Sequence, residues 1–294
     1  MATNEELKAR RSRAKAMVLR KSSAGSAVPA VMFAIVIGVL VASTLFLHFD
    51  HIWWFPPAIT PVGHQIDHQF LLTFIVTGIV FVLAQLTLAW MVFRYRDQGH
   101  KAHFVRGSHV LEVAWTTITL VIFVSLGVMA AHAWGEVHFG GPAPGALQVE
   151  VTGVQFQWNF RYPGPDGKFG RIVPADIDAS VGNPLGLDPN DPEGKLNIVT
   201  PSLYLPVNRP IVLMIRSQDV IHSFFVRELR IKQDAVPGLV IPVHFTVNKI
   251  GTYEITCNQL CGLGHYHMHA FLHVLSQADF AQWEKKQWAS LSTQ

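Results

Sequence analysis

Three long apolar runs occupy the first half of the chain, at 27–49, 70–93 and 110–134. The first two contain no charged residue, and the third contains only Glu112, near its start. A helix needs about 20 residues to cross the hydrocarbon core of a bilayer. Only helices and closed barrels satisfy their backbone hydrogen bonds in lipid, and unbroken apolar runs of this length are not barrel strands. We therefore expect three transmembrane helices.

The basic residues that flank these runs predict the orientation of the chain. Seven precede the first run and four lie between the second and the third, whereas none lies between the first and the second. Because basic flanks stay in the cytoplasm, we expect 1–26 to be a cytoplasmic N-terminus, 27–134 to be the transmembrane region, and the remainder to be outside. A cleaved signal peptide is the alternative for the first run, which is long for that role.

Short strand-like runs replace the apolar runs after residue 146. They lie at 147–152, 155–162, 211–216 and 251–256. Such β-branched and aromatic runs, separated by Gly, Pro and Asn, predict a β-sandwich or barrel. The segment 163–194 is rich in Gly, Pro and Asp and predicts a long loop, whereas 280–288 predicts a short helix. We expect an extracytoplasmic domain at 146–285 and a C-terminal tail at 286–294.

Composition supports a membrane protein with a polar part. Charged residues make up 15% of the chain and hydrophobic residues 50%, whereas soluble proteins carry roughly 25% charged residues. This excludes a disordered chain and disfavours an ordinary cytosolic enzyme. The net charge of +3 does not indicate a nucleic-acid partner, so the expected surroundings are the lipid bilayer. The two cysteines cannot form a disulfide framework, and no Cys-x-x-Cys-His motif is present for haem attachment.

Both cysteines lie in one short segment together with His265 and Met268. Cys257 and Cys261 thus belong to a soft set of thiolate, imidazole and thioether ligands, which selects copper, zinc or an iron–sulfur centre. The glycines between them allow a tight loop. His222 follows the strand-like run at 211–216 and could reach this loop in a sandwich.

Three alternatives remain open for the cysteine segment. Cys257 and Cys261 could form a disulfide, since the exterior is oxidising. They could belong to a Cys2His2 zinc site completed by His265 and by His267 or His269. They could also share one face of a helix with His265, although the glycines weaken that interpretation.

The histidine and cysteine segments together resemble the copper motif of subunit II of haem-copper cytochrome c oxidases. The matching positions are Asp219-Val-x-His222-Ser-Phe and Cys257-x-Gln259-x-Cys261-Gly-x-x-His265-x-x-Met268. Three further segments are similar, at Glu112-Val-Ala-Trp-Thr, Gln155-x-x-Trp158 and Lys232-x-Asp234-Ala-x-Pro-Gly. The resemblance extends over the second and third apolar runs and the β-rich half. The helix at 27–49 is additional to the family's two-helix minimum.

The resemblance implies a cupredoxin-like Greek-key β-sandwich that holds a binuclear copper centre, CuA. Cys257 and Cys261 would bridge the two coppers as thiolates, and His222 and His265 would each bind one. The weaker ligands would be Met268 and the backbone carbonyl of Gln259. Asp219 and Asp234 are candidates for supporting the ligands, although a turn-capping role is as good an interpretation of Asp219.

The function that the resemblance implies is electron uptake in a bacterial-type inner membrane. CuA would accept electrons from a cytochrome c donor and pass them to haem in subunit I, where O2 is reduced to water and protons are pumped. Glu112 would lie at the mouth of a proton path, or would be an interfacial acid hydrated by headgroups. The alternatives are a CuA subunit of a nitric oxide reductase and a membrane-tethered copper-binding protein.

Two departures from the family motif concern function. Gln259 stands where the family usually has Glu, which weakens the expectation of a magnesium ion at the subunit I interface. Phe156 stands where the family has the tryptophan that receives electrons from cytochrome c, while Trp158 is retained. These changes suggest a divergent branch with a different donor, such as a cytochrome held in a supercomplex.

Overall fold

The computed structural model describes residues 4–22, 28–49, 55–96, 101 and 103–292. The chain forms two compact units, of which the first comprises Met1–Phe55 with Leu71–Phe123 and the second comprises Pro56–Phe70 with Val124–Gln294.

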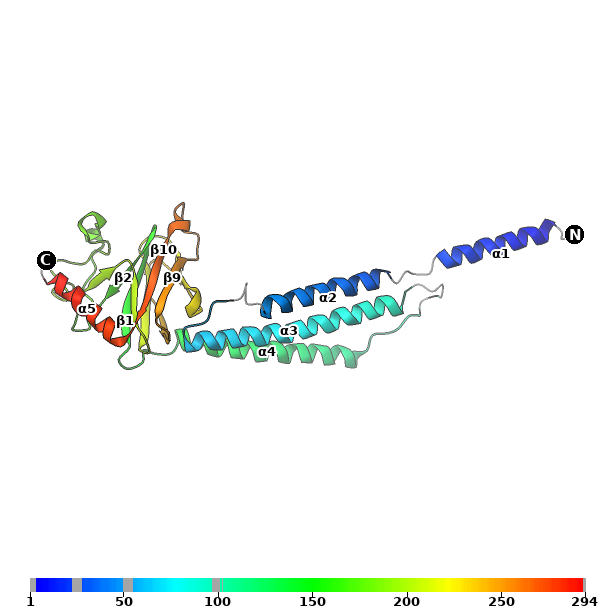
Figure 1. Ribbon diagram of the computed structural model, residues 1–294, viewed down its shortest axis with the longest axis horizontal. Helices are drawn as coiled ribbons and strands as arrows, with labels where there is room; N and C mark the ends of the chain where they lie inside the picture. The colour runs from blue at the N-terminus through cyan, green and yellow to red at the C-terminus, as the bar shows by residue number, and fades with distance from the viewer. Residues whose placement is uncertain (1–3, 23–27, 50–54, 97–100, 102, 293–294) are drawn as a thin grey trace. The chain divides into compact units, whose positions relative to one another are not determined.

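Among the described residues of the N-terminal half there are four helices, and each predicted apolar run coincides with one of them over its described residues (Figure 1). They are α1 (Asn4–Ser22), α2 (Val28–Phe49), α3 (Pro61–Arg94) and α4 (His109–His138). The first residue of the predicted first run, Ala27, lies outside the described residues.

Helix α3 begins at Pro61, well before the apolar run at 70–93. The hydroxyl of Thr60 accepts a hydrogen bond from the backbone N–H of Gly63 at 2.9 Å, which is the bond of an N-cap residue. Pro61 occupies the first helical position, where its missing N–H costs nothing. The helix therefore starts in a polar segment that hydropathy alone did not identify.

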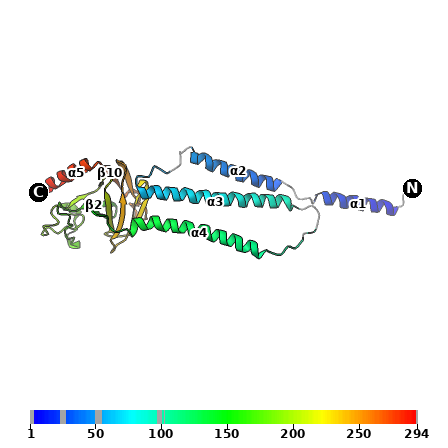
Figure 2. The ribbon, with the colours of Figure 1, turned by 90° about the horizontal axis from the view of Figure 1, so that it is seen from below.

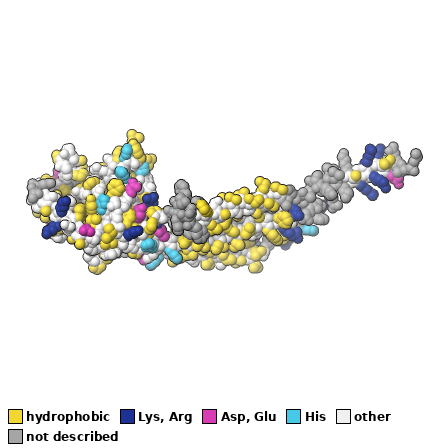
Figure 3. Space-filling model, viewed as in Figure 1, with side chains coloured by type: hydrophobic (Ala, Val, Ile, Leu, Met, Phe, Trp, Pro, Cys, Tyr) yellow, Lys and Arg dark blue, Asp and Glu magenta, His cyan; other side chains and the backbone are white. Residues whose placement is uncertain are grey.

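Two of these helices, α3 and α4, are long and apolar enough to cross a membrane. The most apolar part of each is not buried at all within the chain, and hydrophobic side chains cover the visible face of the helical region (Figure 3). Such a surface needs lipid or partner helices to cover it. In α2 the described apolar stretch, Val31–Phe46, is shorter. The described residues therefore contain two candidate spans, and the expected crossing at 27–49 stays a prediction.

The C-terminal half is a sandwich of two five-stranded sheets (Figures 1 and 2). The strands are β1 (Leu147–Val154), β2 (Gln157–Tyr162), β3 (Ile198–Thr200), β4 (Leu203–Pro206), β5 (Pro210–Ser217), β6 (His222–Val226), β7 (Ile231–Ala235), β8 (Ile241–Thr246), β9 (Gly251–Cys257) and β10 (His269–Leu275). The sheet orders are β3-β2-β1-β5-β8 and β4-β10-β9-β6-β7. Apolar side chains of both sheets form one core between them, so the predicted sandwich is confirmed.

Strand pairing differs from a purely antiparallel arrangement at two places. Strand β1 pairs with β5 in parallel, and β10 pairs with β4 in parallel, whereas the remaining pairs are antiparallel. Since a Greek key consists of antiparallel strands, the predicted Greek-key connectivity is modified at these two pairs. Strands β3 and β5 belong to the first sheet, whereas β4 belongs to the second. The chain therefore crosses to the other sheet after β3 and returns after β4.

The predicted strand at 155–162 is wrong at its first two residues. Gln155 and Phe156 form the turn between β1 and β2. The carboxylate of Asp219 accepts the backbone N–H of Gln155 at 2.8 Å, so this N–H is bonded to a side chain and not to a neighbouring strand. His222 follows the predicted strand at 211–216, as expected, and it is also the first residue of the next strand, β6.

The long loop predicted at 163–194 is confirmed and is fastened to the sandwich through a buried arginine. The Arg161 side chain is only 3% exposed and forms an ion pair with Glu150 at 2.5 Å. It also donates to the carbonyl of Gly170 and to the side chain of Asn197. One charged residue on β2 therefore holds both ends of the loop.

The C-terminal helix is longer than predicted. Helix α5 spans Gln277–Leu291, and the hydroxyl of Ser276 caps it by accepting the N–H of Asp279. Phe280 is buried, and Trp288 packs against the sandwich core. Most of the segment expected to be a tail at 286–294 is therefore helical, because its apolar side chains face the core.

The start of α3 is joined to the sandwich within the second unit. Arg230, the residue before β7, donates to both carboxylate oxygens of Asp67 at 2.6 and 2.9 Å and to the carbonyl of Pro56 at 2.6 Å. Backbone hydrogen bonds at Ile59 extend this contact on either side. The first turns of α3 thus belong to the same packed body as the β-strands.

Candidate metal centre

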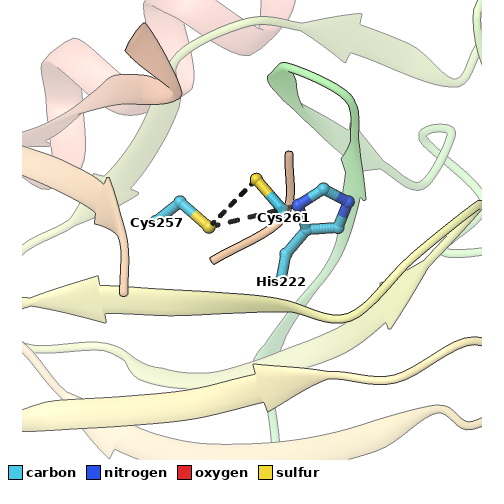
Figure 4. Close-up of side chains that lie close together, drawn as sticks. All are labelled: His222, Cys257 and Cys261. Atoms are coloured by element: carbon cyan, nitrogen blue, oxygen red, sulfur yellow. Dashed lines mark hydrogen bonds between the residues drawn. The ribbon is translucent and has the colours of Figure 1, made fainter. Parts of the chain in front are cut away.

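Adjacent strands bring the predicted histidine and cysteine ligands together. His222 is the first residue of β6 and Cys257 is the last residue of β9. These strands are antiparallel neighbours, with Phe224 opposite Cys257. Cys261 lies on the loop that follows β9, and its thiol projects toward the other two side chains (Figure 4). The site therefore forms at one end of the second sheet.

The sulfur and nitrogen atoms of the predicted ligands lie in mutual contact. The sulfur atoms of Cys257 and Cys261 are 3.9 Å apart. The Cys257 sulfur is 4.0 Å from Nδ1 of His222, and the Cys261 sulfur is 3.5 Å from Nδ1 of His265. The sulfur of Met268 is 3.8 Å from that of Cys261. The five side chains thus surround one small volume.

The backbone carbonyl of Gln259 completes this group. Its oxygen lies 3.2 Å from the Cys257 sulfur, whereas the Gln259 side chain is exposed. The predicted use of the carbonyl, and not the side chain, is compatible with this position.

The alternatives for the cysteine segment fit the structure less well. Both cysteines are free thiols, so they do not form a disulfide. The segment after Cys257 is a loop that contains one short 3-10 helix, at His265–His267, and not an α-helix with the ligands on one face. His267 packs its ring on Tyr266, and His269 lies 3.7 Å from the carboxylate of Glu254. Neither imidazole therefore takes the place that a Cys2His2 zinc site would require.

The ligand side chains are largely removed from water. His222 is 0% exposed, Met268 2%, Cys261 5% and Cys257 8%. The N–H of Cys257 donates to the carbonyl of Met268 at 3.1 Å, and the N–H of Asn258 donates to the carbonyl of Ser223 at 2.9 Å. Burial and these backbone bonds hold the loop in a fixed position against β6.

The two thiols differ in acidity. Burial raises the pKa of Cys257, but the His222 imidazole and nearby backbone groups outweigh burial and lower it to about 6. Burial and the adjacent charge of Cys257 raise the pKa of Cys261 to about 11. Burial also opposes the positive charge of His222, yet hydrogen bonds with Cys257 and Asp219 raise its pKa overall. One thiolate is therefore ready for a cation at neutral pH.

Asp219 holds the His222 ring from the side away from the sulfurs. Its carboxylate lies 2.8 Å from Nε2 of His222 and accepts the N–H of Val220 at 2.6 Å. Burial would raise the pKa of Asp219, but these hydrogen bonds and the one from Gln155 lower it. A ligand histidine whose second nitrogen meets a carboxylate is fixed in its orientation.

Asp234 is placed one step further from the ligands. It accepts the hydroxyl of Ser223 at 2.7 Å and lies 2.9 Å from the ammonium of Lys232. Its contacts are therefore with the neighbour of His222 and not with the ring itself. Sequence reasoning did not identify Gln155 as part of the site, although its side chain donates to the carbonyl of Cys261; the Gln-x-x-Trp pattern was the available signal.

Phe156 and Trp158 occupy different environments. Trp158 is 1% exposed, and its ring centroid lies 6.0 Å from that of His222. Phe156 is 37% exposed, and its ring lies so close to Gly262 and Gly264 that a Cβ at either position would fall within 3.1 Å of it. Of the two aromatic residues, only Phe156 can touch a docking partner.

Glu112 belongs to the other compact unit. It lies in the first turn of α4, where its side chain is exposed and 3.2 Å from Nδ1 of His109. Its predicted role on a proton path stays a prediction.

The fold and the site define a class of protein: a cupredoxin-like β-sandwich with a candidate copper site, preceded by membrane-spanning helices. Residues 147–275 match the family model of the cytochrome c oxidase subunit II periplasmic domain, and residues 48–132 match the model of its transmembrane domain. The latter match contains the second apolar run and most of the third, and it excludes most of α2. The chain belongs to the cytochrome c oxidase subunit II family.

Known relatives agree with this assignment. The chain is 36% identical to alternative cytochrome c oxidase subunit 2 of Bradyrhizobium diazoefficiens, over 88% of this chain and 94% of the relative. It is 28% identical to cytochrome c oxidase subunit 2 of Cereibacter sphaeroides, over 78% of each chain. It is also similar to the crystal structure of the periplasmic domain of cytochrome oxidase subunit II of Bradyrhizobium japonicum, with 26% identity, a TM-score of 0.38, and coverage of 51% of this chain and 99% of that one.

These comparisons confirm the predicted family and the general function. The chain is a subunit of a haem-copper oxidase, which is an oxidoreductase complex. A nitric oxide reductase subunit and a membrane-tethered copper-binding protein are not favoured, since both relatives are cytochrome c oxidase subunits.

Proposed function

We propose that this chain carries the binuclear CuA centre of its oxidase and takes up electrons from a c-type cytochrome. The observation that carries the proposal is the convergence of two free, buried cysteines with His222 on one small volume, where the three ligand atoms lie within 4.8 Å of one another. His265 and Met268 extend the same cluster.

The donor set fits copper. Thiolate, imidazole and thioether ligands select copper over the hard cations that prefer oxygen. The ligands would be Cys257, Cys261, His222 and His265, with Met268 and the carbonyl of Gln259 as the weaker ones. A pair of coppers held by these residues would supply one-electron transfer with little change in geometry.

The residues of this chain hold the site still and dry. Asp219 fixes the ring of His222, and Gln155 fixes the loop through the carbonyl of Cys261. Asp234 restrains Ser223, next to the ligand on β6. Because buried ligands with fixed orientations move little, the reorganisation energy of each electron transfer would be small.

The exposed ring of Phe156 is the proposed contact for the electron donor. It lies against the glycines of the ligand loop and therefore separates the ligands from a docked protein by one side chain. Trp158, buried beside His222, would support the ligands from inside and would not meet the donor. Haem in subunit I would receive the electron, and that subunit would reduce O2 to water and pump protons.

The membrane part of the proposal concerns the transmembrane helices, their orientation and Glu112. Helices α2, α3 and α4 would cross a bacterial-type inner membrane with the N-terminus in the cytoplasm, because the basic residues precede α2 and lie between α3 and α4. Glu112 would then lie near the cytoplasmic surface, at the start of a proton path into subunit I. The exposed amide of Gln259 offers no charge for a magnesium ion, so that ion is not part of the proposal.

Metal analysis of the purified oxidase tests the copper assignment. We expect about two copper ions in this subunit, and we expect Cys257→Ser to lose both, since bridging thiolates hold both ions. His267→Asn is the matched control and should retain them. One zinc ion in place of copper, or full copper content in the Cys257→Ser variant, would overturn the proposal.

The role of Glu112 has a separate test. Glu112→Gln should slow turnover and proton uptake while leaving the copper spectrum unchanged, because the described contact of its carboxylate is with His109. His109→Gln, which removes its neighbour, is the matched control for the local contact. Unchanged turnover in the Glu112→Gln variant would remove the proton path from the proposal without affecting the copper centre.

A further inference from the structure

Helix α1 concentrates the positive charge of the chain. Of the 23 lysines and arginines, seven lie in this helix, together with two glutamates. The seven are Lys8, Arg10, Arg11, Arg13, Lys15, Arg20 and Lys21. Figure 3 shows dark blue Lys and Arg side chains gathered on α1. One helix of 19 residues therefore carries nearly a third of the basic residues of the chain.

The described side chains of α1 present this charge on two sides. All side chains from 5 to 14 are exposed. Because a helix repeats every 3.6 residues, Lys8 and Arg11 lie one turn apart on one side. Arg10 and Arg13 lie one turn apart on the nearly opposite side. Leu7 is the one large apolar residue at 5–14 and is 50% exposed, so this described part of α1 has no apolar face.

A diffuse anionic surface matches such a helix better than a protein groove does. Protein interfaces have an apolar core inside a polar rim, and the stretch 5–14 offers no such core. Anionic lipid headgroups need none, because they attract Lys and Arg by charge, which is worth about 5-fold in binding for each residue near the surface. A helix is about 10–12 Å thick and the Debye length is about 8 Å, so both charged sides of a helix lying on this surface contribute.

The length of the chain keeps α1 close to the start of α2. Helix α2 begins at Val28, and its apolar stretch begins at Val31. The backbone from Ser22 to Val28 spans at most about 22 Å, and Arg13 lies about 14 Å further along α1. Arg13 is therefore no more than about 35 Å from the start of α2. If α2 crosses the bilayer, the headgroups that surround its end are within reach of α1.

On the basis of the proposed crossing of α2, we propose that α1 binds the anionic phospholipid headgroups of the membrane surface that α2 enters. The exposed basic side chains on both sides of α1 supply the attraction. The helix lies among the headgroups without inserting an apolar face into the hydrocarbon. The binding depends on the number of positive charges and not on bidentate geometry, so lysine serves as well as arginine.

Hydrogen exchange at the backbone amides of α1 in the intact oxidase tests this binding. The oxidase is placed in nanodiscs of phosphatidylcholine, either alone or with about a third of the lipid replaced by phosphatidylglycerol. We expect the anionic lipid to slow exchange in α1 about 5-fold or more, because a helix held at a surface opens less often. High salt should abolish most of this difference, since it screens the charges.

Substitutions in α1 separate charge from other causes of protection. Arg10→Gln, Arg11→Gln and Arg13→Gln together should remove most of the effect of anionic lipid. Arg10→Lys, Arg11→Lys and Arg13→Lys together are the matched control and should keep it, since Arg, Lys and Gln have similar helix propensities. Glu5→Gln removes a negative charge and should slow exchange further in the anionic discs. Leu7→Gln should change nothing, because no apolar side chain is inserted.

The outcomes separate this proposal from the proposed function. Equal exchange rates of α1 in the two kinds of disc would overturn the lipid site, and two equally slow rates would show that another subunit covers the helix. An effect of anionic lipid that survives the three Gln substitutions, or that Leu7→Gln removes, would overturn it as well. Failure of the proposed crossing is distinct, because the amides of 31–46 would then exchange rapidly in both kinds of disc.

Discussion

A methyl group at Gly264 should displace the ring of Phe156 and do little else. The Cβ of an alanine there would lie 2.4 Å from Cδ2 and 2.7 Å from Cγ of that ring, whereas carbon atoms in contact are about 3.5–4.0 Å apart. The ring must therefore move by roughly 1 Å. The backbone of Gly264, with φ −91° and ψ 9°, is accessible to alanine, so the cost comes from this one contact.

The expected cost of Gly264→Ala is about 1 kcal/mol, at the low end for an overpacked site, because Phe156 is 37% exposed and can turn toward solvent. In a Phe156→Ala background the same substitution should cost close to nothing, since its clash partner is gone. Unfolding of the purified chain in guanidinium, followed by tryptophan fluorescence, measures both differences. Reduction of the copper centre by the donor should also slow in Gly264→Ala, with the copper spectrum retained.

Gly262→Ala is the matched control for this cycle. Its φ of +138° strains any side chain, so its cost should persist after Phe156→Ala. Equal costs of Gly264→Ala in both backgrounds would refute the placement of Phe156 over the ligand loop.

Three other substitutions test separate contacts. Glu150→Gln leaves the buried side chain of Arg161 without its counter-charge and should lower the free energy of unfolding by about 3 kcal/mol. Unfolding in guanidinium chloride measures this loss. A loss below about 1 kcal/mol would show that water reaches the ion pair. Asp219→Asn should lower the free energy of unfolding near neutral pH. Because the folded-state pKa of Asp219 is lowered from 3.8, the difference in stability between the variant and the unmodified chain should disappear as the pH falls below that ordinary value. A difference in stability that is constant with pH would contradict this origin. Asp67→Asn breaks both bonds to Arg230 and should speed hydrogen exchange at the first turns of α3, and unchanged exchange would mean that backbone bonds alone hold those turns.

The sequence predicts the parts of the fold that depend on local pattern. Unbroken apolar runs identify α2, α3 and α4, and short β-branched or aromatic runs identify β1, β5 and β9. The start of α3 was missed because its first turns are polar and hydropathy does not register a cap. Thr60 followed by Pro61 was the local signal for that start.

Long-range pairing limits what the sequence shows about the site. The cysteine segment is visible because Cys257, Cys261, His265 and Met268 are close in sequence. Their union with His222 depends on the pairing of β6 with β9, which no local pattern specifies. The bond from Gln155 to Cys261 spans 106 residues and is hidden for the same reason.

The burial of Trp158 was accessible from periodicity. Trp158, Phe160 and Tyr162 alternate along β2 and share its core face, as a period of two residues requires. Phe156 has the same parity, so the alternation alone would place it on the core face as well. It is exposed because Gln155 and Phe156 form the turn that precedes β2, and the sequence did not show where this strand begins.

The electron paramagnetic resonance spectrum of the copper-loaded protein tests the central claim most directly. If Cys257 and Cys261 bridge a binuclear centre, the spectrum will show the hyperfine pattern of one electron shared between two copper nuclei. The pattern of a single copper, or a silent spectrum with zinc bound, would contradict the account.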